Sequence, residues 1–431
     1  MSMKETFEKI KALPEAQKAL DFIKKDLDLN WEQHQELTLI PAFSLYEPEK
    51  AARFKEMCEE IGYVMEDDEV HNIYTTIKGT GNGPTVYITA HIDTVFPLDT
   101  PLAITLKEDG KYYCPGIGDD TASLANILTL MRAFKESGIK LKGDVIIGGN
   151  VGEEGLGDLY GMKNFFGKKE HAEGVDGFLS IDGCGNSITY GGTGSYRYKV
   201  TFSNCGGHSH GDFGMPNPIH AMGRVISKFA DMEVPTKPYT SFSIGVVDGG
   251  TSVNSIAVQC SMLVDMRSRD KVELDKVDAM FKKIVAEGVA EENARWDRDR
   301  EKMRTAPTYK GSDEADKVVN VEIQKVGDRP AGQQPFEATI VQATAEAYRA
   351  MGFEPKFNES SSVDANVPIS MGIPGLAIGG GGSQGNAHSK NEWYAPTPDK
   401  AEGTFKLFLL VCGLCGVDGV SEPMLPVRNP K

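Results

Sequence analysis

The alternation of short apolar strands with helical patterns restricts the fold of this chain more than any other feature. Strands are predicted at 72–78, 85–90, 144–149 and 177–181, and helices at 16–27, 48–61 and 123–137. Strands that alternate with helices are typical of a mostly parallel sheet covered by helices. The pattern resumes with a helix at 337–351 and a strand at 372–380. We therefore predict an α/β domain formed by residues 1–194 and 330–431.

A segment with a different pattern interrupts this domain. It contains predicted strands at 196–202, 241–247, 257–267 and 318–326, and predicted helices at 218–232 and 271–296. The order strand, helix, two strands, helix, strand is that of a ferredoxin-like α+β sandwich. We therefore predict an inserted α+β domain at residues 195–329.

Charge and composition exclude several classes of partner. The formal net charge of the 431 residues is -16, which argues against nucleic acid or an anionic membrane as a partner. We find no apolar run long enough to cross a bilayer and no signal peptide, so we expect a cytoplasmic protein. The chain has seven cysteines, and Cys412 and Cys415 lie in an apolar helical run. We expect reduced thiols, and core packing for this pair.

Five polar motifs follow predicted strands or open a helix. His91 and Asp93 end the strand at 85–90, and residues two apart in a strand point to the same face. The other four are GIGDDTAS at 116–123, GEEG at 152–155, SIDG at 180–183, and the segment 385–392 around His388. Because ligands bind at the carboxyl ends of strands in α/β sheets, these groups are expected to converge. Histidines and carboxylates without nearby cysteines suit zinc, manganese or cobalt, and suffice for two metals with one bridging carboxylate.

The motifs ITAHIDTVFP, GIGDDTAS, GEEGLGD, SIDG and AHSKNEW resemble, in this order and spacing, those of a di-zinc peptidase family. That family contains peptidase T, carboxypeptidase G, succinyl-diaminopimelate desuccinylase and aminoacylase. The resemblance implies a zinc-peptidase-type catalytic domain interrupted by a lid and dimerisation domain. It also implies a homodimer formed through the inserted domain, and two divalent metal ions per chain. We expect zinc, with cobalt or manganese as alternatives.

The resemblance also implies a role for each motif residue. His91 would bind the first metal, Asp182 would complete that site, and Asp119 would bridge both metals. Glu154 and His388 would bind the second metal. Glu153 would be the general base, because a carboxylate that is not a ligand is free to move protons. Asp93 would orient His91, and the Asp119–Asp120 peptide is often cis in such proteins.

The inserted domain carries further residues of this pattern. His208 would reach the partner subunit's site and hold the oxyanion, with His210 as the alternative. Asn254 and Arg267 would bind substrate, since an arginine fork suits a carboxylate. One departure is Thr121, where many relatives have lysine two residues after the bridging aspartate.

These residues predict a metal-dependent hydrolase that cleaves small peptides, an aminopeptidase or tripeptidase of peptidase T type. Aspartate at position 182 favours this class, because deacylases and carboxypeptidases of the family are associated with glutamate there. The alternatives are an N-acyl-amino-acid amidohydrolase or carboxypeptidase of the family, and a non-catalytic dimer that binds metal or peptide. The sequence GGSQG at 381–385 matches a serine-hydrolase motif, but no histidine follows His388 to complete a triad.

Overall fold

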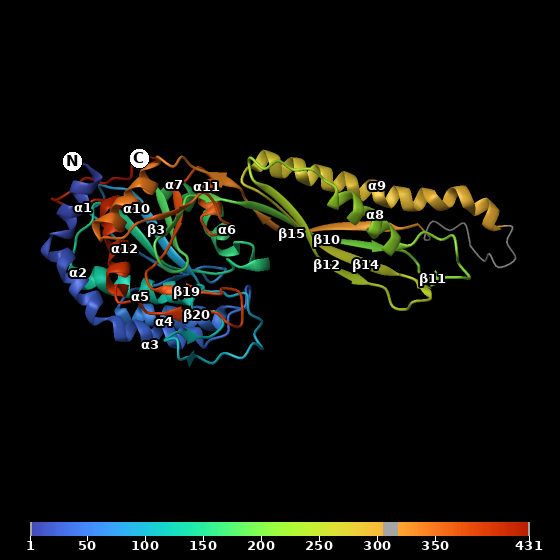
Figure 1. Cartoon of the computed structure of the whole chain (residues 1–431). Coiled ribbons are helices and arrows are strands. Elements are labelled where there is room, and N and C mark those ends of the chain that lie inside the picture. Colours follow the sequence, from blue (N-terminus) through green and yellow to red (C-terminus); the bar gives the residue numbers. More distant parts are fainter. Residues whose placement is uncertain (1, 305–317, 430–431) are drawn as a thin grey trace. The chain divides into compact units, whose positions relative to one another are not determined.

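The computed structural model describes residues 2–304 and 318–429 (Figure 1). The chain forms two compact units, Met1–Gly192 with Gly332–Lys431, and Thr193–Ala331. The predicted boundaries at 194/195 and 329/330 differ from these by two residues. Among the described residues, no helix combines the length and apolar character that a bilayer crossing requires.

The first unit is built on an eight-stranded sheet with the order β1-β2-β6-β3-β7-β18-β8-β17. Its strands are β1 Glu66–Asp67, β2 Ile73–Ile77, β3 Thr85–His91, β6 Asp144–Asn150, β7 Gly177–Ile181, β8 Ser187–Thr189, β17 Lys356–Asn358 and β18 Gly375–Ile378. The central strands β6, β3, β7 and β18 pair in parallel, whereas β2 pairs antiparallel with β6. The predicted mostly parallel α/β sheet is therefore confirmed.

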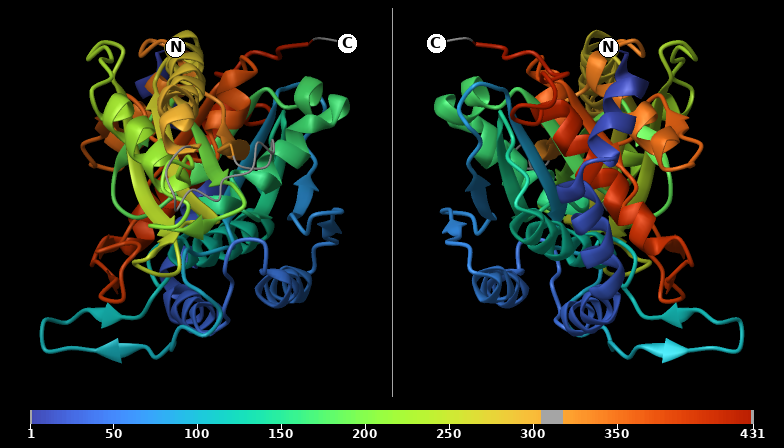
Figure 2. Two further views of the ribbon diagram at one scale, coloured as in Figure 1. Left: turned by 90° about the vertical axis from the view of Figure 1, so that its right-hand side faces the viewer. Right: turned by 90° about the vertical axis from the view of Figure 1, so that its left-hand side faces the viewer.

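Helices cover both faces of this sheet. They are α1 Met3–Lys11, α2 Pro14–Lys25, α3 Leu27–Thr38, α4 Pro48–Ile61, α5 Thr121–Ser137, α6 Tyr160–Gly167, α7 Lys169–Gly174, α10 Thr339–Ala350, α11 Asn366–Ser370 and α12 Lys400–Cys415, with the 3-10 turn η1 Gly155–Gly157. The right-hand view in Figure 2 shows the N-terminal α1 near the C-terminal α12. Lys9 of α1 donates through Nζ to the carbonyl of Val420, which follows α12.

Alternate side chains of the central strands face two separate cores. In β3, Val86, Ile88 and Ala90 pack in the larger core with α1–α5, α10 and α12. Tyr87 points to the other face, where α6 and α11 pack. Both faces of β3 are buried, which explains its nearly continuous apolar sequence. Cys412 and Cys415 are buried in the larger core, as predicted.

Two smaller sheets complete the first unit. One is four-stranded, with the order β19-β20-β5-β4, and the other joins β16 to β9. Their strands are β4 Thr105–Leu106, β5 Tyr112–Tyr113, β9 Gly191–Gly192, β16 Gly332–Gln333, β19 Ser383–Gly385 and β20 Trp393–Ala395. The pairing of β20 with β5 brings the segment around His388 to the segment before Asp119.

The second unit has the predicted ferredoxin-like arrangement. Its elements are β10 Gly194–Ser203, β11 Gly207–His208, α8 Pro218–Ala230, β12 Thr240–Gly249, β13 Ser255–Ile256, β14 Gln259–Ser268, α9 Lys271–Arg304 and β15 Asn320–Arg329. The antiparallel sheet has the order β12-β14-β10-β15. Asn217 caps α8 by accepting a hydrogen bond from the amide of Ile219, and the apolar stripe of α8 includes Val225 and Phe229.

Candidate metal centre

The residues predicted to bind metal lie in the first unit, at the carboxyl edge of its sheet. His91 is the last residue of β3, Glu154 follows β6, and Asp182 follows β7. Since β3 is parallel to both β6 and β7, the carboxyl ends of the three strands meet at one edge. Asp119 precedes α5, and His388 follows β19. The structure thus brings all five predicted ligands to one region.

Asp119 lies between two histidines. Its Oδ1 atom is 3.1 Å from Nε2 of His91, and its Oδ2 atom is 3.2 Å from Nε2 of His388. The same nitrogen of His388 is 2.6 Å from Oε1 of Glu154. A carboxylate that presents one oxygen to each of two ligand groups has the geometry of a bridging ligand. The Asp119–Asp120 peptide bond is cis.

The donor atoms form overlapping groups whose members lie within 4.8 Å of one another. The groups are His91, Asp119, Asp120 and Asp182; Asp119, Glu154 and His388; and His91, Glu153 and Glu154. The first two groups share Asp119. Imidazole nitrogens and carboxylate oxygens without cysteine match the donors that zinc, cobalt and manganese accept. The side chains present therefore fit two divalent cations.

Asp120 belongs to the first donor group, yet both of its oxygens already accept backbone hydrogen bonds. Oδ2 accepts from the amide of His91 at 3.2 Å, and Oδ1 accepts from the amide of Gly183 at 3.1 Å. Asp120 therefore joins the ends of β3 and β7, which carry His91 and Asp182. The carboxylate of Asp119 is the one more available to bind metal.

The ring of His91 is held in one orientation. Its Nδ1 atom lies 3.0 Å from the backbone carbonyl of Asp93 and 3.5 Å from the Oδ1 atom of Asp93. A carbonyl only accepts hydrogen bonds, so Nδ1 carries the proton and donates it, which leaves Nε2 for a metal. The nearest contact of Nδ1 is with the Asp93 carbonyl rather than its carboxylate, which the sequence could not distinguish.

The carboxylates around this centre favour positive charge. Contacts with Asp119 and Glu154 raise the pKa of His388 to about 10. Burial and the neighbouring charge of Asp119 raise the pKa of Asp182 to about 6. Like charges packed this closely repel one another, and divalent cations would offset that repulsion.

The carboxylate of Asp93 fixes the loop that carries both glutamates. Its Oδ1 accepts from the amide of Glu153, and its Oδ2 accepts from the amide of Glu154, each at 2.9 Å. The hydroxyl of Ser44 donates to the same Oδ2 at 2.6 Å. Both glutamates are buried, so this loop is positioned with little freedom.

Glu392 supports the predicted metal centre, and no role was predicted for it from the sequence. Its side chain is buried, and its two oxygens accept from three backbone amides in the loop before α5, those of Gly116, Gly118 and Asp119. Glu392 thereby positions Asp119 between His91 and His388. A signal was available, since Glu392 lies inside the motif around His388, but its spacing to Asp119 along the chain gave no indication of contact.

Comparison with known sequences identifies the family. The sequence profile of the peptidase family M20/M25/M40 matches residues 87–411. The chain belongs to this family. The uncharacterized protein YqjE of Bacillus subtilis is 26% identical over 381 residues, covering 84% of this chain and 92% of the relative. Together with the donor groups, family membership makes the chain an M20 metallohydrolase.

Solved structures share the fold at low sequence identity. An aminopeptidase PepT from Bacillus cereus has a TM-score of 0.67 and 19% identity, with coverage of 89% of this chain and 97% of its own. A tripeptidase from Staphylococcus aureus has a TM-score of 0.66 and 20% identity, with coverage of 89% and 96%. The dipeptidase Dug1p from Saccharomyces cerevisiae has a TM-score of 0.64 and 16% identity, with coverage of 92% and 98%.

In the second unit of this M20 protein, His208 is oriented as a hydrogen-bond donor would be. Its Nδ1 accepts from the amides of His210 and Gly211, at 3.2 and 3.1 Å. An imidazole whose Nδ1 accepts carries its proton on Nε2, so Nε2 can donate to a substrate. This geometry favours His208 over His210 for the predicted role.

Asn254 lies beside His208, whereas Arg267 does not. The amide of Ser209 donates to the carbonyl of Asn254, and His208 pairs with Ser255. The two-stranded sheet of β11 and β13 follows the Ser203–Gln259 end of β10 and β14, and between the two the amide of Asn204 donates to the carbonyl of Val258. Arg267 lies eight residues from Gln259 in the opposite direction along β14, about 26 Å at ~3.3 Å per residue.

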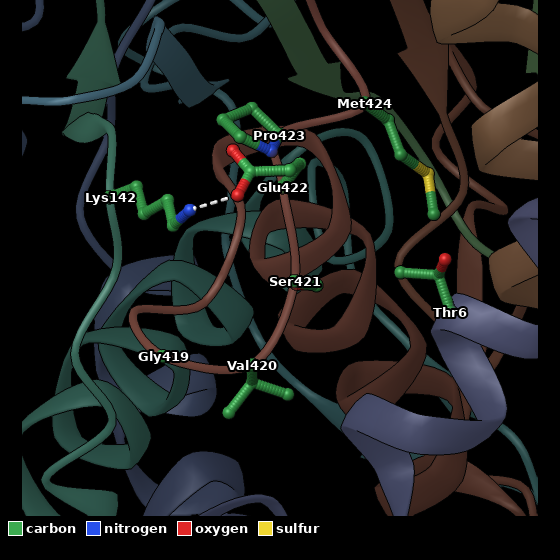
Figure 3. Close-up of a pocket in the computed structure, with 8 residues that line it drawn as sticks. All are labelled: Thr6, Lys142, Gly419, Val420, Ser421, Glu422, Pro423 and Met424. Carbon is green, nitrogen blue, oxygen red and sulfur yellow. Dashed lines mark hydrogen bonds and ion pairs between the residues drawn. The ribbon is translucent and has the colours of Figure 1, made fainter. Parts of the chain in front are cut away.

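A surface pocket of about 630 Å³ lies elsewhere on the first unit (Figure 3). It is lined by Thr6, Lys142, Gly419, Val420, Ser421, Glu422, Pro423 and Met424. Its charged groups, Lys142 and Glu422, pair at 2.6 Å. None of the residues predicted to bind metal lines this pocket, so the pocket is separate from the metal centre.

Proposed function

We propose that this M20 metallohydrolase cleaves the peptide bond of small peptides, as an aminopeptidase or tripeptidase of peptidase T type. The observation that carries the proposal is the position of Asp119, with one oxygen toward His91 and the other toward His388. This arrangement fits two divalent cations, zinc in the first instance, with Glu153 beside them. Two such cations would polarise the amide carbonyl and lower the pKa of a water molecule.

Metal binding, proton transfer and substrate contact would be carried out by different side chains. His91, Asp119 and Asp182 would hold one cation, and Asp119, Glu154 and His388 the other. Glu153 would take a proton from the attacking water and deliver it to the leaving amine. Asp93 holds the backbone of both glutamates, so the base and the ligand keep a fixed relation. Asn254 and Arg267 would contact the substrate.

One observation supports a peptidase over a deacylase. Position 182 is aspartate, which in the family is associated with aminopeptidases and dipeptidases. The similar solved structures include the peptidases described above, but also an aminohydrolase and an amidase. An N-acyl-amino-acid amidohydrolase or a carboxypeptidase of the same family is the alternative. A non-catalytic metal- or peptide-binding dimer would not need Glu153.

The proposal is tested with a panel of di- and tripeptides, each with a free and an N-acetylated amino terminus. Zinc, cobalt and manganese are supplied separately, and released amino acids are measured. We expect hydrolysis of the free peptides and little of the acetylated ones. Preferential hydrolysis of the acetylated compounds would replace the peptidase proposal by the deacylase, and no hydrolysis of either would favour the binding protein.

Within the second unit, the separation of Arg267 from His208 supports a homodimer. Arg267 is about 26 Å, at ~3.3 Å per residue, from Gln259, and His208 pairs with Ser255 beyond Gln259. If both residues contact one small substrate, this separation favours a contribution from two copies. The unit also offers a surface for pairing: β12 is an edge strand, and its Val246 and Val247 are exposed. We therefore propose that His208 and Asn254 serve the active site of the partner subunit.

We expect His208→Ala to lower kcat about 10²–10³-fold with little change in KM. A hydrogen bond to the oxyanion forms fully only in the transition state, so its loss affects turnover more than binding. Metal content should stay at the wild-type value. Steady-state kinetics and metal analysis test this, with His210→Ala as the matched control. The reverse ranking of the two variants would move the oxyanion role to His210.

The partner role of His208 is tested by mixing two inactive proteins. A His208→Ala chain and a Glu153→Gln chain should regain activity after subunit exchange, because the mixed dimer holds one site with both groups intact. Exchange is followed independently by mass spectrometry of tagged chains. Confirmed exchange without recovery of activity would count against a contribution across the dimer.

A further inference from the structure

The segment from Ser44 to Lys50, which precedes the family match at 87–411, contacts the metal centre through three buried side chains. Ser44 donates to Oδ2 of Asp93 and to the carbonyl of Glu154, at 2.6 and 3.1 Å. Oε1 of Glu47 accepts from the amide of Gly152 at 3.0 Å. These contacts fix the loop that carries Glu153 and Glu154. The third side chain, Lys50, supplies a positive charge.

Lys50 is only 1% exposed and extends from the first turn of α4. Its Nζ donates to Oγ1 of Thr121 at 2.8 Å, at the start of α5. Burial lowers the pKa of Lys50 to about 8, whereas the nearby charges of Asp93, Asp120 and Glu392 raise it. The three carboxylates therefore favour the ammonium form of Lys50 and oppose the effect of its burial.

The three carboxylates near Lys50 share one property. Each accepts hydrogen bonds from backbone amides of the loops that carry the predicted metal ligands. The amides are those of Glu153 and Glu154 for Asp93, of His91 and Gly183 for Asp120, and of Gly116, Gly118 and Asp119 for Glu392. Lys50 thus interacts electrostatically with the three groups on which the positions of the predicted ligands depend.

Buried carboxylates close to one another are unfavourable unless an opposite charge accompanies them. We propose that Lys50 is a positioning residue of the metal centre. Its positive charge favours the ionised forms of Asp93, Asp120 and Glu392, and its hydrogen bond holds Thr121, so that the ligand loops keep the geometry that two cations require. The inference rests on the proposed metal-binding roles, and it assigns Lys50 no contact with substrate.

The test is Lys50→Met, which keeps the length of the side chain and removes its charge. The probe is Co²⁺, whose visible absorption reports the arrangement of its ligands without any substrate. We expect the Co²⁺ spectrum of the variant to change, and kcat at saturating Co²⁺ to fall about 10–100-fold, the usual range for side chains that orient metal ligands. A variant with the wild-type spectrum and kcat would overturn the proposal.

Two further variants separate positioning from a general packing effect. Lys400 is also buried, donates to Asn126, and has a pKa lowered by burial to about 8, but its electrostatic neighbour is the thiol of Cys184 rather than a carboxylate. Lys400→Met should therefore leave the Co²⁺ spectrum unchanged, and the same change as in Lys50→Met would contradict the proposal.

Thr121→Val removes only the hydroxyl that accepts from Lys50 and should give an intermediate spectral change. If Lys50→Met does not fold, an unchanged Thr121→Val spectrum counts against the inference.

The spectrum also distinguishes this inference from the proposed function. A protein that hydrolyses no peptide can still bind Co²⁺, and its spectrum still reports whether Lys50 positions the ligands. Conversely, hydrolysis of peptides together with an unchanged Lys50→Met spectrum would refute only the role of Lys50.

Discussion

Replacing Glu153 by glutamine is expected to leave both metals bound and to remove most of the turnover. Glutamine has nearly the shape of glutamate, and the amide of residue 153 would still donate to Asp93. The side-chain amide, however, cannot accept the proton of the attacking water. Loss of a general base costs about 10²–10⁴-fold in rate. Metal analysis and kcat, measured on the same preparation, test both halves of the expectation.

The neighbouring variant Glu154→Gln is the matched control. Oε1 of Glu154 is 2.6 Å from Nε2 of His388, inside the second donor group. Its replacement should weaken metal binding first, and added metal should restore part of the activity. If Glu153→Gln loses metal and Glu154→Gln keeps it, the roles of the two glutamates are exchanged.

The helices that the sequence predicts well have regular apolar stripes and clear ends. The prediction at 48–61 coincides with α4, whose apolar stripe includes Phe54 and Met57 and whose end is Gly62 at a φ of 98°. Glycine adopts this left-handed conformation without steric cost, so it marks the end of a helix in the sequence. The prediction at 16–27 finds α2, which runs from Pro14 to Lys25.

Among the helices that were not predicted, α3 shows a physical reason. Helix α3 buries polar residues, among them Asn30 and His34, against α5 and the loop before it. Hydrophobic periodicity is the main sequence signal for a helix, and a face that buries hydrogen-bonded polar groups does not produce it.

The metal ligands could be predicted from the sequence because each follows a strand or opens a helix within a recognisable motif. The residues that support them were not visible in the same way. Lys50 and Glu392 are charged, and charged residues are rarely buried unless paired, so a sequence suggests that they lie on the surface. One signal did exist for Lys50, since it lies four residues before Phe54 on the buried stripe of α4.

The electrostatics of the centre depend on tertiary contacts that join distant segments. Asp93 accepts hydrogen bonds from Ser44 and from the loop at 153–154, and Glu392 accepts them from the loop before α5. Motif spacing along the chain carries no information on these pairings, because each depends on how strands and loops meet in the folded unit.

Replacing Asp119 by alanine is expected to remove both metals and with them all metal-dependent activity. Wild-type protein should hold about two metals per chain after reconstitution and desalting. Without Asp119, the first group keeps His91 and Asp182, since both oxygens of Asp120 accept backbone hydrogen bonds, and the second keeps Glu154 and His388. Each pair falls short of the three protein ligands that catalytic zinc sites use.

The ligands that serve one site provide the controls for this prediction. Asp182→Ala and His388→Ala each remove a ligand from one group only, so each should leave close to one metal per chain. Metal analysis of the three variants therefore gives a pattern, with neither metal retained in Asp119→Ala and one retained in each of the others. The pattern follows from the contact of one Asp119 oxygen with His91 and of the other with His388. An Asp119→Ala protein that keeps one metal with unchanged affinity would show that Asp119 serves a single site.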